Sequence, residues 1–110
     1  MKIFYNILDA PKVSVTKQAQ VITEGSPLVL FCEVEAGNPA GITSMYWEFQ
    51  PKYLGMESQP LQYSGKGQEL RINRTTYSDA GTYACTAKNS VGTNTARVEV
   101  AINCEYHWTF

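Results

Sequence analysis

The sequence predicts an all-β protein with the Greek-key topology of a two-sheet sandwich. No segment of useful length shows the 3.6-residue period of an amphipathic helix. Instead, short segments with alternating apolar and polar residues are separated by turn-forming clusters of Gly, Pro, Asn and Ser. A chain of 110 residues is long enough for one domain with its own core. These observations favour several antiparallel strands packed in two layers.

Alternation assigns the strands and their inward faces in chain order. Pro11 and the alternation after it predict an edge strand, and residues 20–22 predict a second short strand. Residues 50–67 are the least regular, and Leu61 and Tyr63 are predicted to form a short edge strand there. The predicted inward sets are Leu28, Leu30, Cys32 and Val34; Met45, Trp47 and Phe49; Leu70 and Ile72; and Ala96, Val98 and Val100.

The segment from Asp79 to Cys85 organises the rest of the predicted fold. Tyr83 and Cys85 are two residues apart, so both side chains of a strand point into the same core. Before them, Asp79 and Gly81 predict a tight corner, in which Gly supplies unusual backbone angles. The Asp79 carboxylate is expected to bond to the backbone or to a nearby arginine, for which Arg71 and Arg74 are the candidates.

Cys32, Trp47 and the run Asp79-x-Gly81-x-Tyr83-x-Cys85 together resemble the pattern of the immunoglobulin superfamily. The resemblance extends over residues 11–102 and implies an immunoglobulin-like sandwich with a Cys32–Cys85 disulfide between its two sheets. It also implies that Trp47 packs on this disulfide and that Tyr83 forms a tyrosine corner. The separation of 53 positions between the cysteines and the hairpin at residues 87–93 resemble the I-set or C2 type. The core residues expected on this basis are Trp47, Tyr83, Leu30, Leu70, Ile72 and Val98.

The predicted domain covers residues 11–102. Pro11 resembles the junction between tandem immunoglobulin domains, so residues 1–10 are predicted to be a linker or the end of a preceding domain. Residues 103–110 are predicted to be a C-terminal tail. Residues 1–8 have the residue order of a signal peptide, but Asn6 interrupts the apolar stretch and Asp9 ends it too early. We therefore expect the chain to be a piece of a longer protein.

Cysteine usage and one modification motif predict an extracellular location. A bridge between Cys32 and Cys85 would stabilise the fold by about 4 kcal/mol and would persist in an oxidising compartment. The alternative is a pair of buried thiols, as in intracellular muscle relatives. Asn73-Arg74-Thr75 is an N-glycosylation acceptor, and alternation places Asn73 on the outside. Cys104 is interpreted either as a cross-link to another chain or to a neighbouring domain, or as a free thiol.

Several classes of function are excluded. The formal net charge is -1, without the basic field that nucleic acid or an anionic membrane surface requires. No apolar run is long enough to span a bilayer. The single histidine, His107, lies in the tail, where it and Cys104 would supply only half of a zinc site. No nucleophile has a base at a recognisable spacing, so we expect no enzyme activity, no cofactor and no metal.

The resemblance implies a non-enzymatic recognition or cell-adhesion module of an extracellular tandem-immunoglobulin protein, with a homophilic or heterophilic protein partner. A fragment of an immune or growth-factor receptor differs from it only in partner. The alternative is an intracellular structural module of a titin-like muscle protein. A glycan on Asn73 would shield one sheet and leave the other open, either as a contact surface or as a solvated face of mixed charge. The predicted binding face is Tyr46, Glu48, Thr86, Lys88, Arg97 and Glu99.

Overall fold

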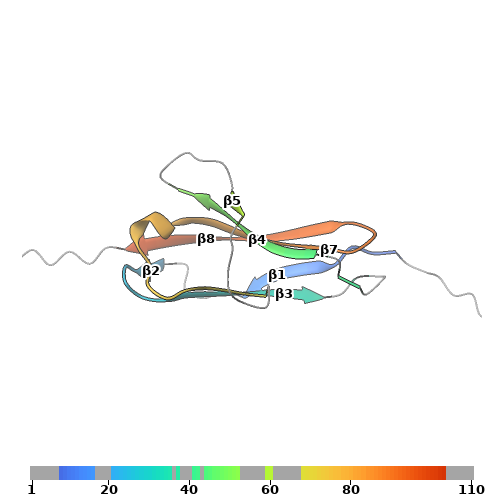
Figure 1. Cartoon of the computed structure of the whole chain (residues 1–110), viewed down its shortest axis with the longest axis horizontal. Coiled ribbons are helices and arrows are strands. Elements are labelled where there is room, and N and C mark those ends of the chain that lie inside the picture. The colour runs from blue at the N-terminus through green and yellow to red at the C-terminus, as the bar shows by residue number, and fades with distance from the viewer. Residues whose placement is uncertain are drawn as a thin grey trace, which may run out of the picture.

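The protein is a two-layer β sandwich, as predicted for an immunoglobulin-like fold (Figure 1). The computed structural model describes residues 8–16, 21–35, 37, 41–42, 44–52, 59–60 and 68–103. Within these ranges one sheet has three strands and the other has five. The predicted strand at Leu61 and Tyr63, the segment from residue 1 to residue 7 and the tail from Cys104 onward lie outside the described residues.

The smaller sheet has the order β1-β3-β6. Strand β3 (Leu28–Glu35) lies in the middle and pairs antiparallel with β1 (Lys12–Thr16) and with β6 (Glu69–Ile72). Every second side chain of β3 from Leu28 to Cys32 is buried, whereas Phe31 and Glu33 are exposed. This pattern follows from strand geometry, in which successive side chains point to opposite faces.

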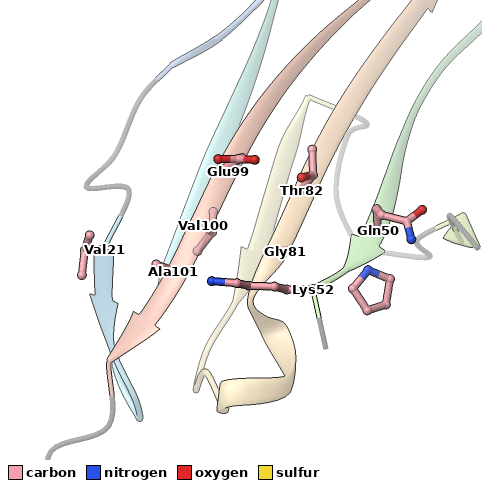
Figure 2. Close-up of a pocket in the computed structure, with 9 residues that line it drawn as sticks. Val21, Gln50, Lys52, Gly81, Thr82, Glu99, Val100 and Ala101 are labelled. Carbon is pink, nitrogen blue, oxygen red and sulfur yellow. The ribbon is translucent and has the colours of Figure 1, made fainter. Parts of the chain in front are cut away.

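The larger sheet has the order β2-β8-β7-β4-β5. Strands β8 (Thr93–Asn103), β7 (Gly81–Lys88) and β4 (Ser44–Pro51) pair antiparallel, and the short β5 (Gln59–Pro60) pairs with β4. Strand β2 (Val21–Thr23) runs parallel to the end of β8, as Figure 2 shows. Of the first two described strands, β1 therefore belongs to the smaller sheet and β2 to the larger one. Alternation predicted a short strand here but not its parallel pairing.

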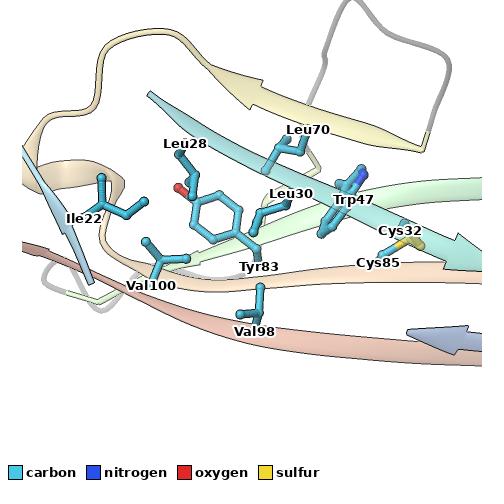
Figure 3. Packing of buried hydrophobic residues seen from close by; sticks show 10 residues of the cluster. All are labelled: Ile22, Leu28, Leu30, Cys32, Trp47, Leu70, Tyr83, Cys85, Val98 and Val100. Atoms are coloured by element: carbon cyan, nitrogen blue, oxygen red, sulfur yellow. A yellow bond between two sulfur atoms is a disulfide. The ribbon is translucent and has the colours of Figure 1, made fainter. Parts of the chain in front are cut away.

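The core lies between the two sheets (Figure 3). The predicted disulfide is confirmed: Cys32 on β3 and Cys85 on β7 are bonded, with their Cα atoms 6.2 Å apart. Trp47 is 0% exposed, and the ring of Tyr83 stacks on that of Phe49 with a centroid distance of 4.6 Å. Of the other predicted core residues, Leu30, Leu70 and Val98 are buried and Ile72 is partly buried.

A short 3-10 helix, η1 (Tyr77–Asp79), forms the corner that leads into β7. The Asp79 carboxylate accepts the backbone N–H of Thr76 at 2.8 Å, and the Tyr83 hydroxyl donates to the Asp79 carbonyl at 2.6 Å. Asp79 is thus bonded to the backbone, the first of the two predicted arrangements, while Arg71 pairs with Glu69 at 2.9 Å. Burial, with a smaller contribution from the Asp79 carboxylate, raises the pKa of the Tyr83 phenol.

Candidate binding face

The outer face of the larger sheet consists of cross-strand rows of side chains on β4, β7 and β8. In one row, Tyr46 lies opposite Thr86, which lies opposite Thr95. The next row has Glu48, Ala84 and Arg97, and the row after it has Gln50, Thr82 and Glu99. We call this surface the β7 face; the residues that line its central groove are Tyr46, Glu48, Gln50, Thr82, Ala84, Thr86, Thr93, Thr95 and Arg97.

The groove follows from the sizes of the side chains in each row. Within the groove, the middle strand β7 contributes Thr82, Ala84 and Thr86, whereas the strands on both sides contribute longer side chains such as Tyr46 and Arg97. The short side chains form a floor and the long ones form two walls. The resulting hollow is open and has a volume of about 580 Å³.

Most of the residues predicted for the binding face are accessible, with one correction. Tyr46 is 41% exposed, and Lys88, Arg97 and Glu99 are also exposed, while Glu48 is partly buried. Thr86 was expected to be accessible on the outside but is only 4% exposed. The Thr86 hydroxyl lies 2.8 Å from that of Thr95 on β8. Thr86 therefore belongs to the floor of the groove, between the longer side chains of the neighbouring strands.

The walls of the groove carry opposite charges. Glu48 on β4 and Arg97 on β8 belong to the same row, with the small Ala84 between them. The floor carries no charge, because it consists of threonine hydroxyls and one alanine methyl group. A partner with charges of both signs and polar side chains that fill the groove is electrically complementary to such a surface.

A second hollow lies on the same sheet near the end of β8 (Figure 2). Its volume is about 400 Å³, and it shares Gln50 and Thr82 with the groove. Its apolar lining includes Val21, Pro51 and Ala101. The two hollows therefore form one continuous surface along β7, wider than the six residues that alternation predicted.

Sequence reasoning missed the residues that give the face its shape. Alternation along β7 places Thr82 and Ala84 on the same side as Thr86, so their outward position was available from the sequence. Their importance was not, because it depends on which residues of β4 and β8 lie opposite them. The register that brings Glu48, Ala84 and Arg97 into one row is a property of the folded sheet.

The glycosylation motif, residues 73–75, follows the last strand of the smaller sheet. Asn73 is exposed and follows directly after the end of β6. Phe31, 41% exposed, and Arg71 lie on the same sheet. The third residue of the motif behaves differently, since Thr75 is only 1% exposed.

Among the residues that the structure describes, no group of three or more His, Cys, Asp and Glu side chains is arranged to hold a metal ion. Within the same ranges, no helix has the length and apolar character needed to cross a membrane.

The fold, the inter-sheet disulfide and the tyrosine corner define an immunoglobulin-type module, and comparison with known families agrees. The sequence model described as "Immunoglobulin domain" matches residues 10–89, which is more than half of the chain. The chain therefore belongs to the immunoglobulin domain family.

Its curated relatives include cell-adhesion proteins. The chain is 33% identical to cell adhesion molecule 2 of Xenopus tropicalis over 93 residues, covering 84% of this chain and 20% of that protein. It is 32% identical to mouse hemicentin-1 over 96 residues, covering 87% of this chain and 2% of that protein. The chain thus corresponds to a small part of each of these relatives.

Solved structures of adhesion proteins have the same fold. The ectodomain of mouse nectin-like molecule 4 matches with a TM-score of 0.69 and 29% identity, covering 92% of this chain and 33% of that one. The N-terminal eight immunoglobulin domains of Down syndrome cell adhesion molecule match with a TM-score of 0.69, covering 87% of this chain and 12% of that one. At 22% identity, the second likeness concerns the fold alone.

Proposed function

We propose that this domain is a non-enzymatic recognition module of an extracellular adhesion protein and that it binds a protein partner through the β7 face. The observation that carries the proposal is the groove itself: a neutral floor on β7 between walls with an aromatic ring and charges of both signs. A surface of this kind suits a protein better than a small apolar ligand, because it is open and mostly polar.

The aromatic and arginine side chains supply the anchors in this proposal. Tyr46 and Arg97 combine large contact areas with directed hydrogen bonds, and such residues are common among those that dominate binding energy. The threonine hydroxyls on the floor act as donors and acceptors for polar groups of the partner. Binding is then a matter of surface complementarity, and several copies of the module in one chain or on one cell would add avidity.

The position of the glycosylation motif also supports a partner that approaches the larger sheet rather than the smaller one. A glycan on Asn73 would occupy the outer side of the smaller sheet, near Arg71. The β7 face lies on the other layer of the sandwich. The sugar would therefore leave the proposed contact surface open while it keeps the opposite face solvated.

The extracellular location belongs to the same proposal. Its support is the Cys32–Cys85 disulfide, which persists in oxidising compartments, together with relatives named as cell-adhesion molecules. The intracellular titin-like module is the other candidate. Intact mass, measured with and without reduction after secretion from animal cells, separates the two. One disulfide and a sugar on Asn73 are expected, whereas reduced core thiols and no sugar would favour the intracellular module.

The binding proposal is tested with multivalent beads that display the domain. We expect wild-type beads to aggregate with one another if the partner is a second copy, or to bind cells that carry the partner if it is another protein. The double variant Tyr46→Ala/Arg97→Ala removes one anchor from each wall and is expected to lose at least tenfold in binding. Unchanged binding by a variant with an unchanged melting temperature would refute the proposed face.

A further inference from the structure

The acceptor motif Asn73-Arg74-Thr75 has one accessible end and one inaccessible end. Asn73, whose amide nitrogen would receive the sugar, is exposed. The hydroxyl of Thr75 is buried and donates to the Ser26 carbonyl at 2.7 Å, with the Thr23 carbonyl 3.4 Å away. The two halves of the motif therefore face different surroundings in the folded domain.

Backbone hydrogen bonds hold Thr75 in this position from both sides. Its N–H donates to the Ser26 carbonyl at 3.1 Å, and its carbonyl accepts the N–H of Gly25 at 2.8 Å. The turn between β2 and β3 is thus closed over Thr75, about 50 residues away in sequence. Exposure of the Thr75 hydroxyl requires this turn to separate from residues 73–76 and to lose these bonds together.

Glycosylation of the motif requires the hydroxyl as well as the amide, because the motif demands Ser or Thr at the third place. In the transfer, the Asn73 Nδ2 atom forms a bond to the anomeric carbon of an oligosaccharide carried on a polyprenyl pyrophosphate. The bond from this carbon to the pyrophosphate oxygen breaks, and the amide nitrogen loses one proton. The transferring enzyme must therefore contact both ends of a motif of which the folded domain presents only one.

We propose that Asn73 is an acceptor only before the domain folds, and that closure of the β2–β3 turn over Thr75 ends the period in which the sugar can be added. This inference rests on the proposed extracellular function, since it presumes passage through a secretory compartment. Thr75 then has two successive roles. Its hydroxyl is part of the acceptor on the unfolded chain and becomes a buried hydrogen-bond donor in the folded one.

The disulfide connects this closure to oxidation of the cysteines. Ser26 precedes β3, which carries Cys32, and Thr75 precedes β7, which carries Cys85. The Cys32–Cys85 bond therefore ties together the two strands that follow the contacting segments. A delay in forming this bond is expected to prolong the open state and to raise the fraction of chains with sugar on Asn73.

The direct test uses the whole chain made in bacteria, with its disulfide formed and without sugar. It is incubated with microsomal oligosaccharyltransferase and a polyprenyl pyrophosphate oligosaccharide, either folded or reduced, alkylated and unfolded. We expect the unfolded chain to be modified at least tenfold faster than the folded one, measured as sugar on Asn73 by mass spectrometry. Equal rates, or no modification of the unfolded chain, would overturn the proposal.

A matched control places an acceptor where the hydroxyl is accessible. In an Asn73→Gln background, Val91→Asn creates a motif of the same type that ends at Thr93, and both residues are exposed in the native fold. The folded control is expected to accept sugar while folded wild-type protein does not. If the folded control is not modified either, burial of Thr75 does not explain the result and the proposal fails.

These outcomes are independent of partner binding. The transfer reaction is measured without any partner, so loss of the β7 face as a binding surface would leave its result unchanged. Conversely, a folded domain that accepts sugar on Asn73 would overturn only the timing of modification.

Discussion

The two ends of the sandwich are closed in similar ways, but they differ in how many hydrogen bonds would remain after the loss of one side chain. At the Thr75 end, the turn Thr23–Ser26 meets residues 73–76. At the Asn89 end, the entering segment from Asp9 to Pro11 meets the β7–β8 turn. Each end has one fully buried polar side chain that donates to a backbone carbonyl far away in sequence: Thr75 across 49 residues and Asn89 across 80.

The difference lies in how much depends on that one side chain. Thr75 is supported by two backbone hydrogen bonds to the same turn, so its hydroxyl is only one of several links. The Asn89 amide uses both of its ends. Its nitrogen donates to the Asp9 carbonyl at 2.7 Å, and its oxygen accepts the N–H groups of Val91 and Gly92 at 2.9 and 3.0 Å. The Asn89 end therefore depends more strongly on a single residue.

Each end also has a glycine that lies against a backbone carbonyl, and these positions are expected to give the largest effects. A Cβ at Gly81 would collide with the carbonyl of Gln50, and a Cβ at Gly37 would collide with that of Asp9. Gly81→Ala and Gly37→Ala are each expected to lower the free energy of unfolding by about 3 kcal/mol, as measured by urea denaturation. Gly41→Ala is the control, since open space surrounds its position, and should be nearly neutral.

The next largest effect is expected at Asn89. Asn89→Ala removes a fully buried side chain and leaves three backbone groups without its hydrogen bonds, so it should lower the free energy of unfolding by roughly 2 to 3 kcal/mol. Asn94→Ala is the matched control, because the Asn94 amide also donates to the entering segment, at the Pro11 carbonyl, but from an exposed residue. It should cost less than about 1 kcal/mol. Equal losses for the two variants would contradict the special role of Asn89.

A smaller effect is expected at the Thr75 end. Thr75→Val keeps the shape of the side chain and removes only the hydroxyl, while both backbone bonds to the turn remain. The expected loss is about 1 kcal/mol in the same denaturation experiment. A loss of stability as large as that of Asn89→Ala would contradict the difference between the two ends, because it would show that the backbone hydrogen bonds of Thr75 do not hold the turn in place without the hydroxyl.

The smallest effect is expected to be a decrease in the free energy of unfolding at alkaline pH, caused by the Tyr83 phenol. Because the pKa of Tyr83 is raised in the folded protein, the unfolded chain loses its phenol proton first as pH increases. The contribution to stability is complete below the unfolded pKa of about 10 and decreases above it. At pH 10.5 the loss is roughly 0.8 kcal/mol. Tyr83→Phe should have a flatter stability profile over this range, and an unchanged slope would show that Tyr83 is not responsible.

The sequence predicted the middle of the sandwich better than its ends. Strand alternation identified Leu30 and Val98 as inward residues because period two depends only on neighbouring positions. It did not identify Thr75 or Asn89, which are polar and lie next to turns. Their burial depends on segments 49 and 80 residues away, and no local pattern records those contacts.

The candidate site shows the same limit. Alternation along single strands was enough to propose Tyr46 and Arg97 for an outward face. The groove between them depends on the register of three strands, which places the short side chains of β7 in the middle. The prediction that Thr86 is accessible was wrong for the same reason. Alternation shows on which side of the sheet a residue lies, but it does not show whether longer side chains on the neighbouring strands cover it.

The central claim, recognition of a protein through the β7 face, is tested most directly by comparing two double variants in one binding assay. Tyr46→Ala/Arg97→Ala changes the β7 face, and Phe31→Ala/Arg71→Ala likewise removes one aromatic ring and one arginine, but from the smaller sheet. Tyr46 and Phe31 are each 41% exposed, so the two changes are closely matched. We predict that only the first variant loses at least tenfold in bead or cell binding. Loss in the second variant alone, or in neither, would contradict the account.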